Sequence, residues 1–98
     1  MRVMWAPRAI ARAVEIAQYI AHHRPGAAAR WVEALFARAA TLGRQARRGR
    51  KVPELDRDKI RQVLHGDYRI IYRIDPKRIV VLTARLGRLQ WDPKETRA

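Results

Sequence analysis

The chain has 98 residues, with 22 lysines and arginines against 9 aspartates and glutamates, and it has no cysteine. A chain of this length holds one domain, its lack of cysteine excludes disulfides, thiolate nucleophiles and cysteine-ligated zinc, and no apolar run approaches the roughly 20 residues of a membrane-spanning helix. The formal charge of +13 favours a polyanionic partner, although a solvated basic surface in an arginine-rich protein is the simpler alternative.

The first half of the chain predicts a short strand followed by two helices. Residues 2–5 can form the strand, and Pro7 fits the first turn of the helix after it. Pro25-Gly26 ends this helix, and a second helix runs to Gly43, so the short break predicts an αα-hairpin. The residues expected to face the core are Ile10, Ala13, Val14, Ala17 and Ala21 in the first helix, and Ala28, Trp31, Val32, Leu35, Phe36, Ala39 and Leu42 in the second.

Two features of these helices have both a functional and a structural interpretation. Trp31 and Phe36 could form an exposed recognition stripe, but aromatic residues at helical spacing usually belong to the core, and we assign them there. His22 and His23 point in different directions on a helix and make a poor metal pair. Favourable interaction with the helix C-terminus explains them more simply.

Residues 44–52 form the densest basic run and contain no acid. Gly49 predicts a flexible segment. The run could wrap a phosphate backbone, in which case affinity would fall steeply with salt, or it could be a solvated loop. We keep both interpretations open for its four candidate binding residues, Arg47, Arg48, Arg50 and Lys51.

The segment 60–74 predicts a β-hairpin that turns at His65-Gly66-Asp67. Side chains in a strand alternate between two faces, so the second strand has one aromatic and aliphatic face and one face that carries arginines. An arginine face on a rigid strand suits an anion, and plain solvation of the outer face is the alternative. The arginines expected on this outer face are Arg61, Arg69, Arg73 and Arg85.

The last segments complete the predicted fold. A turn at residues 75–78 leads to 79–85, which is apolar enough for a central strand. We expect order only as far as Trp91, which either covers the core or stacks on a base. The prediction is an α+β protein of order β-α-α-β-β-β, with the helical hairpin packed on one face of a small antiparallel sheet, and residues 1–98 forming a single domain.

The order of elements, the phrase GRKVPEL at 49–55, and GDYRIIYRI at 66–74 resemble the RelE/ParE superfamily of bacterial toxins. The opening WAPRAIARAVEIAQYI and the phrase RPGAAARW also look like that family, and the resemblance spans residues 3 to about 91. It implies the toxin half of a type II toxin–antitoxin pair, neutralised by a cognate antitoxin with an acidic or amphipathic segment. The RelE-like branch cuts mRNA on the ribosome, and the ParE-like branch poisons DNA gyrase.

In this resemblance, Arg69 falls where RelE-like nucleases keep a phosphate-binding arginine. In a nuclease, Arg69 and Arg61 would hold the scissile phosphate and Arg88 would assist. Nuclease members often carry a histidine near the position of Leu86 and an arginine near that of Leu89. Leucine cannot transfer a proton, and nothing in the sequence brings the carboxylate of Glu54 to the arginine face.

The leading interpretation is therefore a ParE-like toxin without enzymatic activity that binds DNA gyrase. The alternatives are a metal-independent, ribosome-dependent mRNA endonuclease and a non-toxic basic nucleic-acid-binding domain. We expect a cytoplasmic protein, because the apolar N-terminal segment is too short for a signal peptide, with no cofactor, metal, membrane partner or small-molecule substrate. An antitoxin would use an exposed apolar groove along the helices or beside the sheet. The candidate target-binding residues are Arg47, Arg48, Arg50, Lys51, Arg73, Arg85 and Trp91.

Overall fold

The structure is a computed structural model that describes residues 1–87 and 93–96. Its elements, in chain order, are β1 (Arg2–Trp5), α1 (Pro7–His23), α2 (Ala28–Leu42), the 3-10 turn η1 (Ala46–Arg48), β2 (Arg50–Lys51), β3 (Ile60–His65), β4 (Tyr68–Ile74), β5 (Arg78–Leu86) and the 3-10 turn η2 (Pro93–Thr96). The predicted order β-α-α-β-β-β is confirmed, with the two-residue strand β2 as an addition. None of the described helices is both long and apolar enough to cross a bilayer.

The strands form one sheet in the order β1-β5-β4-β3-β2. The pairs β3–β4 and β4–β5 are antiparallel, as the two hairpins predict. β1 lies parallel to β5, with Arg2 in register with Arg78, so the sheet is mixed rather than purely antiparallel. This difference arises because no hairpin joins β1 to β5: both helices and three strands lie between them along the chain, so no tight turn forces the two strands to run in opposite directions.

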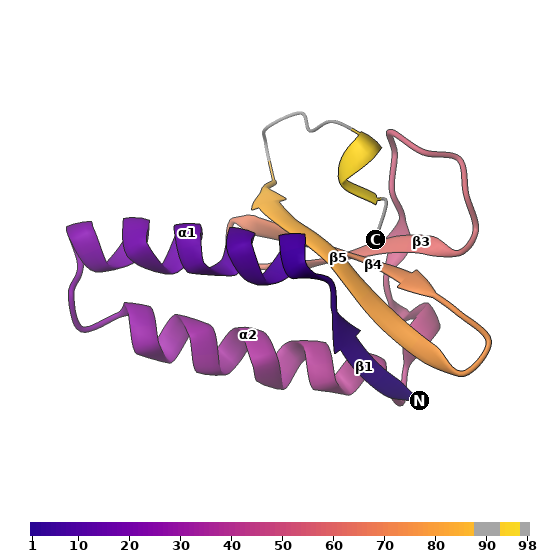
Figure 1. Cartoon of the computed structure of the whole chain (residues 1–98), viewed down its shortest axis with the longest axis horizontal. Helices are drawn as coiled ribbons and strands as arrows, with labels where there is room; N and C mark the ends of the chain where they lie inside the picture. Colours follow the sequence, from indigo (N-terminus) through magenta and orange to yellow (C-terminus); the bar gives the residue numbers. More distant parts are fainter. Residues whose placement is uncertain (88–92, 97–98) are drawn as a thin grey trace.

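The helical hairpin covers one face of this sheet, and the segment after β2 together with η2 lies on the other side (Figure 1). α1 begins with Pro7 at its first position, as predicted. Small residues of the helices, Ala9, Ala13 and Ala39, are buried with Leu35 against Ile70 of β4. Alanines at these positions allow the helix backbones to approach the sheet closely.

The predicted core stripe of the helices is only partly buried. Ile10, Val14 and Phe36 are 50%, 49% and 47% exposed, so the assignment of Phe36 to the core is wrong. Trp31 is half-buried. The cause is that Ala9 and Ala13 face the sheet, and residues one position further along α1 point about 100° away from it. The apolar arc is therefore wider than the surface that the sheet can cover.

The central hairpin forms as predicted, with Gly66 at a φ of 60° in its two-residue turn. Both faces of β4 are buried, which the sequence pattern did not predict. Ile71, on the face away from the helices, is covered by Val52 and Leu55 from the segment between β2 and β3. The supposed outer face is therefore largely closed by this segment.

Gly49 has a different role from the predicted one. It is buried, and its N–H donates to the Tyr72 hydroxyl at 3.0 Å, while that hydroxyl donates to the Ala46 carbonyl at 2.6 Å. A Cβ on Gly49 would overlap the Tyr72 hydroxyl and lie 2.6 Å from the Gln62 carbonyl oxygen. Glycine is needed here for close approach between backbone and ring, and the turn before β2 is fixed rather than flexible.

Candidate functional site

Arg69 is held inside the protein by a carboxylate. Its side chain leaves β4 on the face away from the helices and the residue is only 5% exposed. The two terminal nitrogens donate to the two carboxylate oxygens of Glu54, at 2.9 and 2.8 Å, and one of them also donates to Gln62 Oε1 at 3.1 Å. This two-pronged geometry is the strong form of an arginine–carboxylate pair. The expectation that Glu54 stays away from the arginine face is wrong, because residues 52–59 fold back over that face.

Arg85 of β5 lies directly opposite Arg69 in the sheet register and is half-buried. Like charges placed opposite each other across two strands destabilise a sheet. The negative charge of Glu54 offsets this repulsion, so one carboxylate supports an arginine pair. An anionic ligand would have to compete with Glu54 for the Arg69 guanidinium.

Arg61 does not share this face. The β3–β4 register places it opposite Tyr72, and therefore on the side of the sheet that the helices cover. Its guanidinium donates to Asp58 at 2.7 Å and to the Gly49 carbonyl at 3.1 Å. The predicted grouping of Arg61 with Arg69 on one face is thus wrong. The structure does not bring these two candidate catalytic residues together, and the third, Arg88, lies outside the described residues, as does Trp91.

Some of the remaining basic candidates form ion pairs with acidic side chains, and others do not. Arg73 pairs with Asp75 at 2.7 Å, and hydrogen bonding to Arg73 lowers the pKa of the Asp75 carboxyl. Arg47 pairs with Asp58 at 2.9 Å, and this contact is the main reason that the pKa of Asp58 is lowered. The candidates of the basic run that are exposed and form no ion pair within residues 1–87 and 93–96 are Arg48, Arg50 and Lys51.

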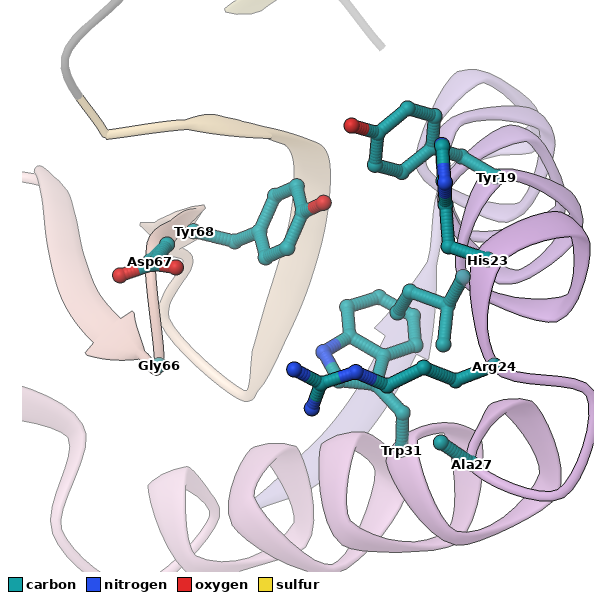
Figure 2. A pocket seen from close by; sticks show the side chains of 9 residues that line it. Tyr19, His23, Arg24, Ala27, Trp31, Gly66, Asp67 and Tyr68 are labelled. Atoms are coloured by element: carbon teal, nitrogen blue, oxygen red, sulfur yellow. The ribbon is translucent and has the colours of Figure 1, made fainter.

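A pocket of about 500 Å³ opens between the helices and the β3–β4 turn, and it was not predicted. Tyr68 points from the hairpin toward the helices, and Arg24 extends from the end of α1 toward the hairpin (Figure 2). The edge of Trp31 packs on Tyr68 with ring centroids 5.5 Å apart. No sequence pattern indicates this pocket, because its lining comes from three segments that are distant along the chain. The lining residues are Tyr19, Ile20, His23, Arg24, Ala27, Trp31, Gly66, Asp67 and Tyr68.

His65 lies beside this pocket and gives the stability a defined pH dependence. Burial and then the positive charge of Arg38 lower its pKa, against an opposing hydrogen bond to the Trp31 backbone. Below a pH of about 6.5 the unfolded chain takes up a proton that the folded protein resists, so the free energy of unfolding should fall as the pH drops through this range. Urea unfolding between pH 7 and pH 5 measures the slope. His65→Gln should flatten it, whereas His22→Gln, on the exposed end of α1, should leave it intact; equal slopes in all three proteins would contradict the prediction.

An apolar groove of about 360 Å³ lies between α1 and α2. It confirms the expectation of an exposed groove along the helices. Ile10, Val14 and Phe36 form its most exposed apolar surface, and the Phe36 ring packs on Trp5 with centroids 4.8 Å apart. The lining residues are Ile10, Ala13, Val14, Ala17, Gln18, Ala21, Ala28, Val32 and Phe36.

Over residues 1–87 and 93–96, no three histidine, aspartate or glutamate side chains are grouped so that they could hold a metal ion. These residues form an apolar groove, an aromatic pocket, and a set of arginines of which several are already paired.

Comparison with known proteins places this geometry in context. A family model described as the ParE toxin of a type II toxin–antitoxin system, parDE, matches residues 3–90. Among solved structures, a chain of the chromosomal ParDE toxin–antitoxin system from P. aeruginosa has a similar fold, with a TM-score of 0.74 and 19% identity over 88% of this chain and 95% of that chain. No curated protein sequence matches significantly.

Proposed function

Because this chain belongs to the ParE toxin family of type II toxin–antitoxin systems, we propose that it arrests growth by binding DNA gyrase in the cytoplasm, and that a cognate antitoxin neutralises it. The family membership supports an antitoxin partner. The target is inferred from the site, because one fold can host different activities.

One observation favours a binding toxin over an mRNA endonuclease. The arginine expected to hold a scissile phosphate, Arg69, is 5% exposed and already satisfied by both oxygens of Glu54. Phosphate binding there would have to break this pair. Arg61 lies across the sheet, tied to Asp58, so it does not assist Arg69. A toxin that acts by occupying its target needs neither residue to be free. Under this proposal the exposed candidates Arg48, Arg50 and Lys51 are available for contact with the target. Arg73 and Arg85 are half-buried and therefore less available.

The groove between α1 and α2 is the surface that we propose for the antitoxin. Apart from Gln18, its lining residues are aliphatic or aromatic, and an amphipathic helix can place its apolar face in such a groove. The formal charge of +13 on the toxin complements an acidic flank on that helix. Filling the groove would also cover the apolar surface that the sheet leaves exposed.

A gyrase supercoiling assay with relaxed plasmid tests the proposed target. The purified toxin should inhibit supercoiling at micromolar concentration, and adding the antitoxin should restore it. In parallel, the toxin is added to a coupled translation extract and the message is mapped by primer extension. Full supercoiling activity together with discrete toxin-dependent cuts in the message would replace gyrase by the ribosome as the target.

Phe36→Ala should weaken antitoxin binding about tenfold, because it removes the largest exposed side chain of the groove, and buried aromatic residues are common interface hot spots. Isothermal titration with the antitoxin measures the change. Met4→Ala is the matched control, since Met4 is 40% exposed but lies on the sheet face away from the helices. Equal affinities for Phe36→Ala and the unaltered toxin would move the antitoxin to a different surface.

A further inference from the structure

Three arginines from three different elements meet around one small hollow at the β2 edge of the sheet. The hollow has a volume of about 230 Å³. Arg38 comes from α2, Arg48 from η1 and Arg50 from β2. We call this set, with the other lining residues, the basic hollow; the others are Gly49, Gln62, Val63 and Leu64.

No carboxylate offsets the charge of the basic hollow. Its lining contains no aspartate or glutamate. Within residues 1–87 and 93–96, neither Arg38, Arg48 nor Arg50 pairs with an acid, and the one side-chain contact of Arg48 is with Gln45 Oε1 at 3.2 Å. This differs from Arg47 and Arg61 close by, which share Asp58. The convergence of three exposed cations without a counter-charge provides a site for an anion.

The backbone beneath two of these arginines is fixed. Gly49, which separates Arg48 from Arg50, donates to the buried Tyr72 hydroxyl, and the same hydroxyl donates to Ala46 at the start of η1. The hydroxyl of Tyr72 therefore holds both ends of the turn between Ala46 and Gly49 by hydrogen bonds. A ligand that binds here does not have to order the backbone first, which favours binding by a preformed site.

We propose that the basic hollow binds phosphate groups of a nucleic-acid backbone. Guanidinium groups match the geometry of phosphate oxygens, and a backbone supplies successive charges to the rest of the 44–51 run. Leu64, 49% exposed at the rim, offers an apolar surface to a sugar. Contacts to phosphate carry no sequence information, so binding of this kind should depend little on the base sequence. This inference is independent of gyrase, since it concerns nucleic acid alone.

Fluorescence anisotropy with a labelled DNA duplex of about 20 base pairs tests the proposal, with the 98-residue toxin at a series of salt concentrations. The combined variant Arg38→Gln, Arg48→Gln and Arg50→Gln should lose about tenfold or more in affinity, and the slope of log K against log salt should become shallower by about 2–3. The matched control removes the same number of charges elsewhere, with Arg2→Gln, Arg30→Gln and Lys77→Gln, and should stay within about threefold with its slope nearly unchanged. Thermal unfolding of both variants verifies the fold.

A second variant distinguishes the loss of positive charge from a disturbance of the fold. Replacing the same three arginines by lysine keeps every charge, so the salt slope should be retained while affinity falls only modestly. Equal losses in the hollow and control variants would overturn the proposal, because the charge would then act diffusely. Absence of duplex binding at about 50 mM salt would also overturn it, and would assign the hollow to an acidic protein partner instead.

Discussion

Glu54→Ala should lower the free energy of unfolding by about 2–3 kcal/mol, one of the two largest losses that we expect from a single substitution. The reason is that Arg69 stays buried after its counter-charge is removed, with Arg85 directly across the sheet. Breaking a fully buried pair typically costs about 3–5 kcal/mol, and the 28% exposure of the Glu54 side chain lets water reduce that figure. Urea unfolding monitored by tryptophan fluorescence measures the change.

Two further variants isolate the cause of that loss. Adding Arg69→Met to Glu54→Ala should recover part of the stability, because an apolar side chain then replaces the uncompensated guanidinium. Glu15→Ala removes the acid of the exposed Arg12–Glu15 pair and should change stability by less than about 0.5 kcal/mol. If the double variant were less stable than Glu54→Ala alone, the account of Arg69 as a charge held by Glu54 would fail.

Gly49→Ala should destabilise the protein by about 2–4 kcal/mol, since the added methyl group would overlap the Tyr72 hydroxyl and crowd the Gln62 carbonyl oxygen. Either the ring or β2 must move, and both hydrogen bonds of the hydroxyl are then lost or stretched. Thermal unfolding followed by circular dichroism measures the effect.

The chain supplies a control for the chemistry of that substitution. Gly26, in the turn between the helices, has no heavy atom within 4 Å of the place where a Cβ would lie. Gly26→Ala should therefore be neutral or slightly stabilising, because alanine restricts the unfolded chain. Tyr72→Phe in the Gly49→Ala background should relieve part of the clash. A Gly49→Ala protein as stable as Gly26→Ala would show that the turn is not pinned by Tyr72.

The local parts of this fold could be predicted from the sequence. The hairpin at 60–74 follows from the near-alternation of residues 68–74 and a glycine turn. The helices follow from their apolar spacing and from the boundaries at Pro7, Pro25-Gly26 and Gly43. These signals act over a few residues. The face of the sheet on which Arg61 lies could also have been predicted. With a two-residue turn at 66–67, His65 pairs with Tyr68 and therefore Arg61 pairs with Tyr72.

The parts that could not be predicted depend on contacts between distant segments. Glu54 reaches Arg69 only because residues 52–59 fold over the sheet. A loop has no periodic pattern of apolar residues from which its path could be predicted. Arg38 joins Arg48 and Arg50 for the same reason. Phe36 has core-like spacing, yet it is exposed, because periodicity gives the direction of a side chain and not whether another layer covers it.

The parallel pairing of β1 with β5 also has a kinetic consequence. It joins residues 2–5 to residues 78–81, so the edge of the sheet cannot close until almost the whole chain has been made. Contacts of such long range form late, because the loop between them must first be closed at an entropic cost. During translation α1 and α2 leave the ribosome before β4 and β5, the central strands on which they pack, so their apolar arcs are still uncovered. If the antitoxin binds the groove between α1 and α2 as proposed, it can bind the helical hairpin on the nascent chain before the sheet is complete.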